Sequence, residues 1–218
     1  MDAVLFDLYD TLVWSRWGEL SDHVADRLGV DRPTLHAAYD VTRHARSTGA
    51  FDDAEGDMAA VVAAAGVEPD PALIRELADH EREFLREGGI TLYEDSLDVA
   101  AELRARGTKT ALVSNCSHST IPVVERLGLA DVLDVLVLSV TAGVAKPDGG
   151  IYRVALEGVG AAPEQAVFVD DQTRYCDGAA ALGIDTCLIV RPSSDPIEGV
   201  GSGTNGHRVI SDLHALLH

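Results

Sequence analysis

Cysteine, basic residues and long apolar runs are all scarce in this chain of 218 residues. The three cysteines, Cys116, Cys176 and Cys187, are odd in number and lack metal-ligand spacing, which indicates reduced thiols rather than a disulfide framework. No apolar run approaches the roughly 18 residues that a membrane span requires. The N-terminus has no basic segment leading to an apolar run and a cleavage site, so we expect a cytoplasmic protein without a secretory signal.

Basic residues are outnumbered, since 17 Lys and Arg face 36 Asp and Glu and give a net charge of −19. Nucleic acid and anionic membranes bind basic surfaces, so we expect neither as a partner. A small anionic substrate is compatible with this charge where a few basic residues gather locally. The sequence leaves the oligomeric state open. The length and the hydrophobic content of 46% are typical of one large domain, or a domain with an insertion, that has a proper core.

The hydrophobic pattern changes along the chain. Before residue 90, the 3.6-residue periodicity predicts four amphipathic helices, at 19–28, 33–47, 53–65 and 71–86. After it, helices alternate with apolar strands. The predicted strands are 108–115, 132–139, 165–171 and 185–190, and the predicted helices are 94–107, 119–129, 146–160, 174–183 and 210–217. This alternation indicates a Rossmann-like α/β core with a mostly parallel sheet. We expect the core to comprise residues 1–13 and 91–218, with residues 14–90 inserted as an all-helical cap.

Polar side chains follow the apolar strands at several places in this core. They are Asp7, the pair Ser114–Asn115, the residue Lys146 before Pro147, and the pair Asp170–Asp171. In open α/β sheets, ligands bind outside the carboxyl ends of the strands, so the topology brings these residues to one edge. Taken singly, each could be an ordinary turn or helix-cap residue. Their ordered occurrence on separate elements of one sheet favours a site.

The residue types at this edge suggest a chemistry. A carboxylate such as Asp7 can act as a nucleophile that forms a covalent intermediate. Together with Asp170 and Asp171 it makes an oxygen-rich set that suits Mg²⁺, which would neutralise the mutual repulsion of the carboxylates. Lys146 would keep the nucleophile ionised. The Ser114 hydroxyl could donate a hydrogen bond to a substrate oxygen.

These motifs, in this order, resemble those of the haloacid dehalogenase (HAD) superfamily of hydrolases with a helical cap after the first motif. The matching segments are FDLYDTL (6–12), LVSN (112–115), AKPDGGIY (145–152) and VFVDDQTRYCDGAAALG (167–183). The resemblance implies an aspartate nucleophile and a bound Mg²⁺. It assigns catalytic roles to Asp7, Thr11, Ser114 and Lys146, and metal ligation to Asp7, Asp170, Asp171 and the main-chain carbonyl of Tyr9.

The first motif departs from the phosphatase pattern at Tyr9. Phosphatases of the superfamily carry a second aspartate there, as the general acid and base. Neighbouring side chains of a strand point to opposite faces, so Asp10 should not simply replace it. The same tyrosine is similar to the 2-haloacid dehalogenase branch, which uses no metal, and Asn115 and Tyr152 also suit that branch. Its fourth motif, however, has serines and an asparagine where this chain has Asp170 and Asp171.

Three functional interpretations follow from the resemblance. The leading one is a Mg²⁺-dependent phosphatase that acts on a small phosphorylated metabolite. The alternatives are a 2-haloacid dehalogenase-like hydrolase of carbon–halogen bonds, and a catalytically weak protein that binds a small phosphorylated ligand. In each case the expected substrate contacts are Tyr9, Asn115 and, from the cap, Arg43 and Arg46. The Gly-rich stretch 195–208 has no helix in P-loop position, so we interpret it as a flexible surface loop.

Overall fold

The computed structural model describes residues 1–191 and 204–218, and the predicted loop lies mostly in the segment 192–203, outside the described residues. Its centre is a parallel sheet of six strands in the order β5-β4-β1-β6-β7-β8. The strands are β1 (Ala3–Phe6), β4 (Lys109–Ser114), β5 (Val135–Leu138), β6 (Ala166–Asp170), β7 (Asp185–Ile189) and β8 (Arg208–Ile210). From β1 the chain proceeds to β4 and β5 on one side and then to β6, β7 and β8 on the other. The strand order therefore reverses at β1, which is where α/β sheets bind ligands.

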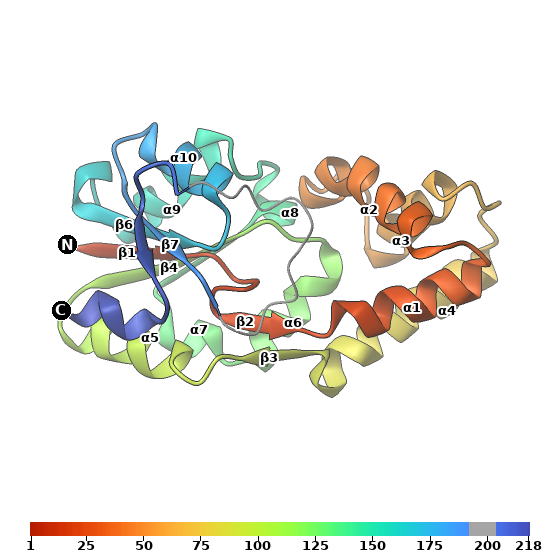
Figure 1. Ribbon diagram of the computed structural model, residues 1–218, viewed down its shortest axis with the longest axis horizontal. Helices are drawn as coiled ribbons and strands as arrows, with labels where there is room; N and C mark the ends of the chain where they lie inside the picture. The colour runs from red at the N-terminus through yellow and green to blue at the C-terminus, as the bar shows by residue number, and fades with distance from the viewer. Residues whose placement is uncertain (192–203) are drawn as a thin grey trace.

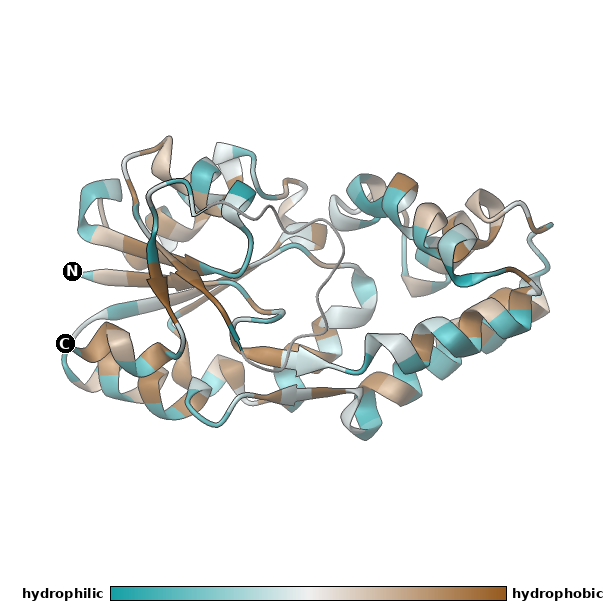
Figure 2. Cartoon of the chain, in the orientation of Figure 1, coloured by the Kyte–Doolittle hydropathy of each residue, from teal (hydrophilic) through white to brown (hydrophobic). Residues whose placement is uncertain are grey.

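Helices cover both faces of this sheet (Figure 1). One layer holds α5 (Ser96–Ala105), α6 (Ile121–Arg126), α7 (Leu129–Val132) and the short helix η4 (Leu213–Leu217), and the other holds α9 (Gly149–Val159) and α10 (Thr173–Ala180). The strand β1 shows why the sheet needs two layers. Its residues Val4 and Phe6 pack into the first layer and Ala3 and Leu5 into the second, all without exposed surface. Figure 2 shows that much of the central sheet is hydrophobic, as burial on two faces requires.

A second group of helices extends beyond the carboxyl ends of the strands (Figure 1). It consists of α1 (Trp17–Leu28), α2 (Arg32–Ser47), α3 (Ala54–Ala64) and α4 (Pro71–Phe84), which share a hydrophobic cluster of their own. The start of three of them follows from N-caps, because Asp31, Asp53 and Asp70 each accept a hydrogen bond from a main-chain N–H of the first turn. The predicted architecture, a Rossmann-like core with a helical cap, is confirmed.

Short strands account for most differences from the prediction. The chain enters and leaves the helical group through β2 (Val13–Ser15) and β3 (Ile90–Leu92), which pair antiparallel. Sequence periodicity cannot identify three-residue strands whose partners lie far along the chain. The predicted helix 210–217 is wrong at its start, because Ile210 ends β8 and only Leu213–Leu217 form a helical turn. Within the described residues, no helix combines the length and the apolar character needed to cross a membrane.

Two histidine rings stack between the first and last helices of the cap. The centroids of His23 on α1 and His80 on α4 lie 3.6 Å apart. Burial lowers the pKa of His23, and the nearby charges of His80 and Arg27 lower it further, against Glu76 and Asp26, which raise it. The unfolded chain therefore binds a proton at this position more readily than the folded one. This group favours folding above the unfolded pKa of about 6.5 and loses that contribution as the pH falls below it.

We therefore expect His23→Gln to reduce the fall in Tm between pH 7.5 and pH 5. The glutamine cannot take up a proton, so acid no longer places a charge at this position, where burial and Arg27 disfavour it. Thermal melts of both proteins at the two pH values measure the effect, and His36→Gln serves as a control because His36 is exposed. An equal fall in Tm for wild type and His23→Gln would contradict the argument.

Candidate active site

Three neighbouring strands end in polar side chains at the point where the strand order reverses. Asp7 follows β1, Ser114 ends β4 and Asp170 ends β6, and β1 lies between the other two. The main chain of Asp7 continues the sheet, since its N–H donates to the Val169 carbonyl at 2.9 Å. The carboxyl ends of these strands point towards the cap (Figure 1).

Lys146 reaches this edge from the loop before α9. Its Nζ donates to Asp7 Oδ1 at 2.5 Å and to Asp170 Oδ2 at 2.6 Å, and all three side chains are buried. The rings of Phe168 and Tyr175 enclose the ammonium, with centroids 5.3 Å and 4.8 Å from Nζ. Burial alone would lower the pKa of Lys146, but the two carboxylates raise it above its ordinary value, so the ammonium stays charged.

The Asn115 side chain fixes the main chain of Lys146. Its Nδ2 donates to the Lys146 carbonyl at 2.9 Å, and its Oδ1 accepts from the Lys146 N–H at 2.7 Å. The side chain thus uses both of its polar ends on one residue. It joins the end of β4 to the lysine loop, and its expected contact with substrate stays a prediction.

The carboxylates at this edge carry more charge than Lys146 compensates. Oxygens of Asp7, Asp170 and Asp171 all lie within 4.8 Å of one another. Burial raises the pKa of Asp171 to about 9, and the charges of Asp170, Asp7 and Asp10 add to the increase. Burial raises the pKa of Asp7 to about 7, although Lys146 opposes the change. An all-oxygen donor set with surplus negative charge is the kind that Mg²⁺ binds, so the residues present fit this ion.

Two buried hydroxyls beside the carboxylates have no hydrogen-bond partner in the described residues, 1–191 and 204–218. They are Thr11 Oγ1, in the loop after β1, and Ser114 Oγ, at the end of β4. Buried polar atoms without a partner are rare in native proteins. Both come from motifs that the sequence singled out, and both suit the oxygen atoms of a bound anion.

The Tyr9 hydroxyl is engaged elsewhere. It lies 2.8 Å from Thr120 Oγ1, and the tyrosine ring packs against Trp17 at the start of the cap, with centroids 5.8 Å apart. Burial raises the pKa of Tyr9, so the hydroxyl remains protonated at neutral pH. The next residue, Asp10, has a left-handed backbone with φ of 56° and is buried close enough to Asp171 to raise its pKa.

The two cap arginines predicted to bind substrate have different surroundings. Arg43 is exposed and forms an ion pair with Asp40, one turn earlier on α2. Arg46 is half-buried, donates to the Tyr39 carbonyl at 3.0 Å and lies over the Tyr39 ring. No carboxylate pairs with Arg46 in the part of the chain that the structure describes, and burial lowers its pKa. Arg46 is therefore the better candidate of the two.

The cap contacts the core at the segment that follows β4. Asp57 Oδ2, on α3, accepts from the main-chain N–H of His118 at 3.0 Å and lies 2.9 Å from the His118 ring nitrogen. Glu81, on α4, accepts from the Ser119 hydroxyl at 2.8 Å, and burial raises its pKa. Sequence reasoning missed both acidic residues, because they occupy ordinary helical positions and only the fold brings them to the core.

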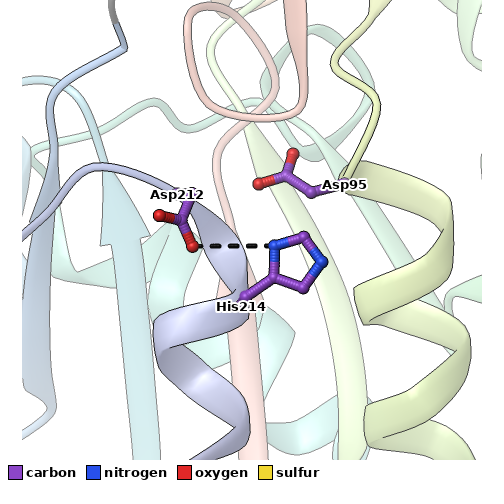
Figure 3. Close-up of side chains that lie close together, drawn as sticks. All are labelled: Asp95, Asp212 and His214. Atoms are coloured by element: carbon purple, nitrogen blue, oxygen red, sulfur yellow. Dashed lines mark ion pairs between the residues drawn. The ribbon is translucent and has the colours of Figure 1, made fainter.

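A second group of possible metal ligands lies next to the C-terminal helix. Asp95, Asp212 and His214 face one another there, and Asp212 Oδ1 lies 3.6 Å from the His214 ring (Figure 3). Both carboxylate oxygens of Asp95 are already bonded to Arg191, and one also accepts from the Leu213 N–H. The other two side chains are exposed, so this group gives no indication of a second metal site.

The chain matches known proteins along most of its length. A model of the haloacid dehalogenase-like hydrolases matches residues 1–183. The chain belongs to this family. Among solved structures, the L-2-haloacid dehalogenase of Xanthobacter autotrophicus, with chloropropionic acid covalently bound, is similar with a TM-score of 0.69 and 20% identity, over 99% of this chain and 96% of that one. At this identity the likeness shows the fold.

Curated relatives of this HAD-like chain include both phosphatases and a dehalogenase. The GMP/IMP nucleotidase YrfG of Escherichia coli is 32% identical over 105 residues, which cover 47% of each protein. The (S)-2-haloacid dehalogenase of Pseudomonas sp. (strain YL) is 35% identical over 109 residues, 50% of this chain and 46% of that protein. The chain spans about half the length, or less, of the curated relatives it matches. These relatives support membership of the family. They do not distinguish phosphate hydrolysis from carbon–halogen hydrolysis, which depends on the residues of the site.

Removing the ammonium of Lys146 should destabilise the fold strongly. In Lys146→Met, three clustered carboxylates lose their buried counter-charge, and the break of a buried ion pair typically costs about 3–5 kcal/mol. Urea unfolding without divalent cations measures the change in the free energy of unfolding. The matched control is Lys109→Met, because Lys109 is exposed and lies 3.7 Å from Asp134. It should cost less than about 1 kcal/mol. Equal losses for the two variants would contradict the structural importance of Lys146.

Proposed function

We propose that this chain is a Mg²⁺-dependent hydrolase of phosphoric monoesters, with Asp7 as the nucleophile and a small phosphorylated metabolite as the substrate. The observation that carries the proposal is the surplus of carboxylates at one edge of the sheet, where the half-buried Asp171 accompanies the buried Asp7 and Asp170. A halide-displacing site would have to bind an anionic haloacid against this charge. A divalent cation resolves the repulsion and also attracts a phosphate.

Each residue of the site then has a role that follows from its contacts. Asp7 attacks phosphorus and forms an aspartyl phosphate, while the bond from phosphorus to the leaving oxygen breaks and that oxygen takes up a proton. Water then attacks the same phosphorus and releases inorganic phosphate, which restores the Asp7 carboxylate. Lys146 balances the charge of Asp7 throughout. The free hydroxyls of Thr11 and Ser114 donate to the phosphoryl oxygens.

The proposed Mg²⁺ ligands are Asp7, Asp170, Asp171 and the main-chain carbonyl of Tyr9. When bound, the ion neutralises these carboxylates and the developing charge of the phosphoryl group. The orientation of the Asp170 carboxylate is fixed, because its Oδ1 accepts from the Gln172 N–H at 2.8 Å and its Oδ2 accepts from Lys146 Nζ.

We further propose that residues 14–90 act as a separate cap, and that Arg46 and Asn115 contribute to binding the substrate. The bonds of Asp57 and Glu81 to the segment after β4 support a cap that closes onto the core and excludes water during the reaction. The three cysteines are all free and buried, which supports a cytoplasmic location.

Carbon–halogen hydrolysis is the second candidate, and one observation favours it. The position of the usual second aspartate is occupied by Tyr9, which has no carboxyl group. Its hydroxyl also binds Thr120 and is not available to the leaving group. A halide leaves without a proton, whereas an alkoxide needs one. In the phosphatase interpretation, the proton comes from water or the substrate, and the reaction is slow. Loss of a general acid typically costs about 10²–10⁴ in rate.

Hydrolysis of p-nitrophenyl phosphate with and without Mg²⁺ tests the proposal. We expect slow release of p-nitrophenol that depends on Mg²⁺, because the carboxylates bind the phosphate only through a cation. Asp7→Asn keeps the shape of the nucleophile without its charge and should abolish release.

The other interpretations predict different results in the same experiment. Halide release from 2-chloropropionate without added metal would replace the phosphatase proposal by carbon–halogen hydrolysis. Binding of inorganic phosphate without turnover of either compound would leave a phosphate-binding protein. Asp7→Asn must retain the wild-type far-UV circular dichroism for these comparisons to count.

Tyr9→Asp should increase the rate at which an alkyl phosphate is hydrolysed, because an alkoxide leaving group needs a proton that p-nitrophenolate does not need. It places a carboxyl group where phosphatases of the family have one, and a positioned general acid contributes about 10²–10⁴ in kcat. Tyr9→Phe removes only the hydroxyl and its bond to Thr120, so it should leave kcat within about threefold. The pH profile of kcat for both variants provides the check, since the new carboxyl group should add a titration that Tyr9→Phe lacks. A loss of activity in Tyr9→Asp, with the fold intact, would argue against the phosphatase interpretation.

A further inference from the structure

A buried arginine two residues after β7 connects the loop after β1 to two other parts of the core. Arg191 Nη2 and Nε both donate to the Thr11 carbonyl, at 2.7 Å and 3.2 Å. Its Nη1 and Nη2 each donate to one oxygen of Asp95, both at 2.9 Å. Asp95 in turn accepts from the Leu213 N–H at 2.8 Å. We call Arg191 and Asp95 the arginine bridge. It joins the loop after β1, the start of α5 and the C-terminal helix.

The geometry of the arginine bridge is specific to a guanidinium. A planar group with several N–H donors can hold a carboxylate along one edge and a carbonyl along another, which a lysine ammonium cannot reproduce. The ring of Tyr93 supports the group, with its centroid 4.1 Å from Cζ. Burial alone would raise the pKa of Asp95, but the bonds from Arg191 and Leu213 hold it below its ordinary value. Asp95 therefore remains ionised as the partner of the arginine.

The arginine bridge acts on Thr11, the residue whose hydroxyl is proposed to donate to the phosphoryl oxygens. Thr11 Oγ1 is buried and has no hydrogen-bond partner in the described part of the chain, so no contact of its own fixes its direction. The position of the hydroxyl depends on the main chain of Thr11, which Arg191 holds through the carbonyl. The next carbonyl, of Leu12, is held by the Ser96 hydroxyl at 2.7 Å and by the Tyr93 N–H at 3.0 Å.

We propose that Arg191 is a positioning residue, which holds the main chain of Thr11 so that the Thr11 hydroxyl points at the phosphoryl group of the substrate. The inference rests on the proposed function, because Thr11 must contact the substrate for its position to matter. Arg191 itself does not take part in the reaction. Within the residues that the structure describes, Arg191 is linked to the proposed site through Thr11, and this gives the proposal a sharp test.

The test is a double-mutant cycle of Arg191→Lys and Thr11→Val with p-nitrophenyl phosphate. Arg191→Lys should reduce kcat about 10- to 100-fold, since a misplacement of about 1 Å can cost that much, and should change KM little. In the Thr11→Val background, which has no hydroxyl to position, Arg191→Lys should change kcat less than about threefold. A merely structural role predicts the same fold-change in both backgrounds, and this result would overturn the proposal.

A matched control separates positioning from general damage. Arg106 also binds a carboxylate and a carbonyl, Glu102 Oε1 and Leu217 O, both at 2.7 Å, but it is exposed and distant in sequence from the loop. Arg106→Lys should leave kcat at the wild-type value. Asp95→Asn provides a milder change of the same bridge and should reduce kcat in the same direction as Arg191→Lys, with a smaller effect on folding. All rates are measured below the lowest Tm of the set.

Hydrogen–deuterium exchange of the peptide covering residues 7–13 gives a readout independent of activity. Exchange there should become faster in Arg191→Lys and Asp95→Asn and stay unchanged in Arg106→Lys. Unchanged exchange in the two bridge variants would overturn the positioning role, whatever the rates. Faster exchange in variants of a protein that hydrolyses no p-nitrophenyl phosphate would show that the arginine bridge holds the loop. That result would refute the phosphatase proposal but not the role of the bridge.

Discussion

The buried ammonium of Lys146 between Asp7 and Asp170 is the interaction on which the site depends. A strand with apolar neighbours on both faces can end in a carboxylate only if a counter-charge reaches the same edge. The lysine comes from a loop more than a hundred residues after Asp7, and several contacts hold it in place. Asn115 holds its main chain, and two aromatic rings enclose its side chain. The surplus charge that remains explains why the site suits a divalent cation.

The parallel sheet determines which residues can share this edge. The chain moves away from β1 in both directions, so β4 and β6 become its two neighbours. Three strand ends then meet without any loop having to be long. The loop after β1 differs from the other loops, because it carries the proposed nucleophile and also leads into the cap. It is held from outside the sheet by the arginine bridge and by the pairing of β2 with β3.

Much of the fold could be predicted from sequence because its signals are local. Apolar runs of three or four residues mark buried strands, and three of the cap helices carry Asp N-caps before their first turns. The candidate site could be predicted in outline for a related reason: a polar residue after a buried strand lies at the carboxyl edge whatever the details of packing. The same pattern also occurs at Arg191, which follows β7, but no sequence motif marks this arginine.

The sequence could not predict which side chains contact one another in the fold. Nothing local distinguishes Arg43, paired on the surface, from Arg46, half-buried on the same helix. Likewise, the hydroxyl of Tyr9 forms a hydrogen bond with the hydroxyl of Thr120, a residue 111 positions away that no local pattern identifies as its partner. That contact removes the tyrosine hydroxyl from the position of a general acid, and the fourth motif keeps the carboxylates that a metal needs. The two motifs are consistent if the site retains binding and nucleophilic attack while proton transfer to the leaving group has been left to the substrate or to water. The chemistry of the leaving group, more than the affinity for phosphate, then decides which substrates this site can turn over.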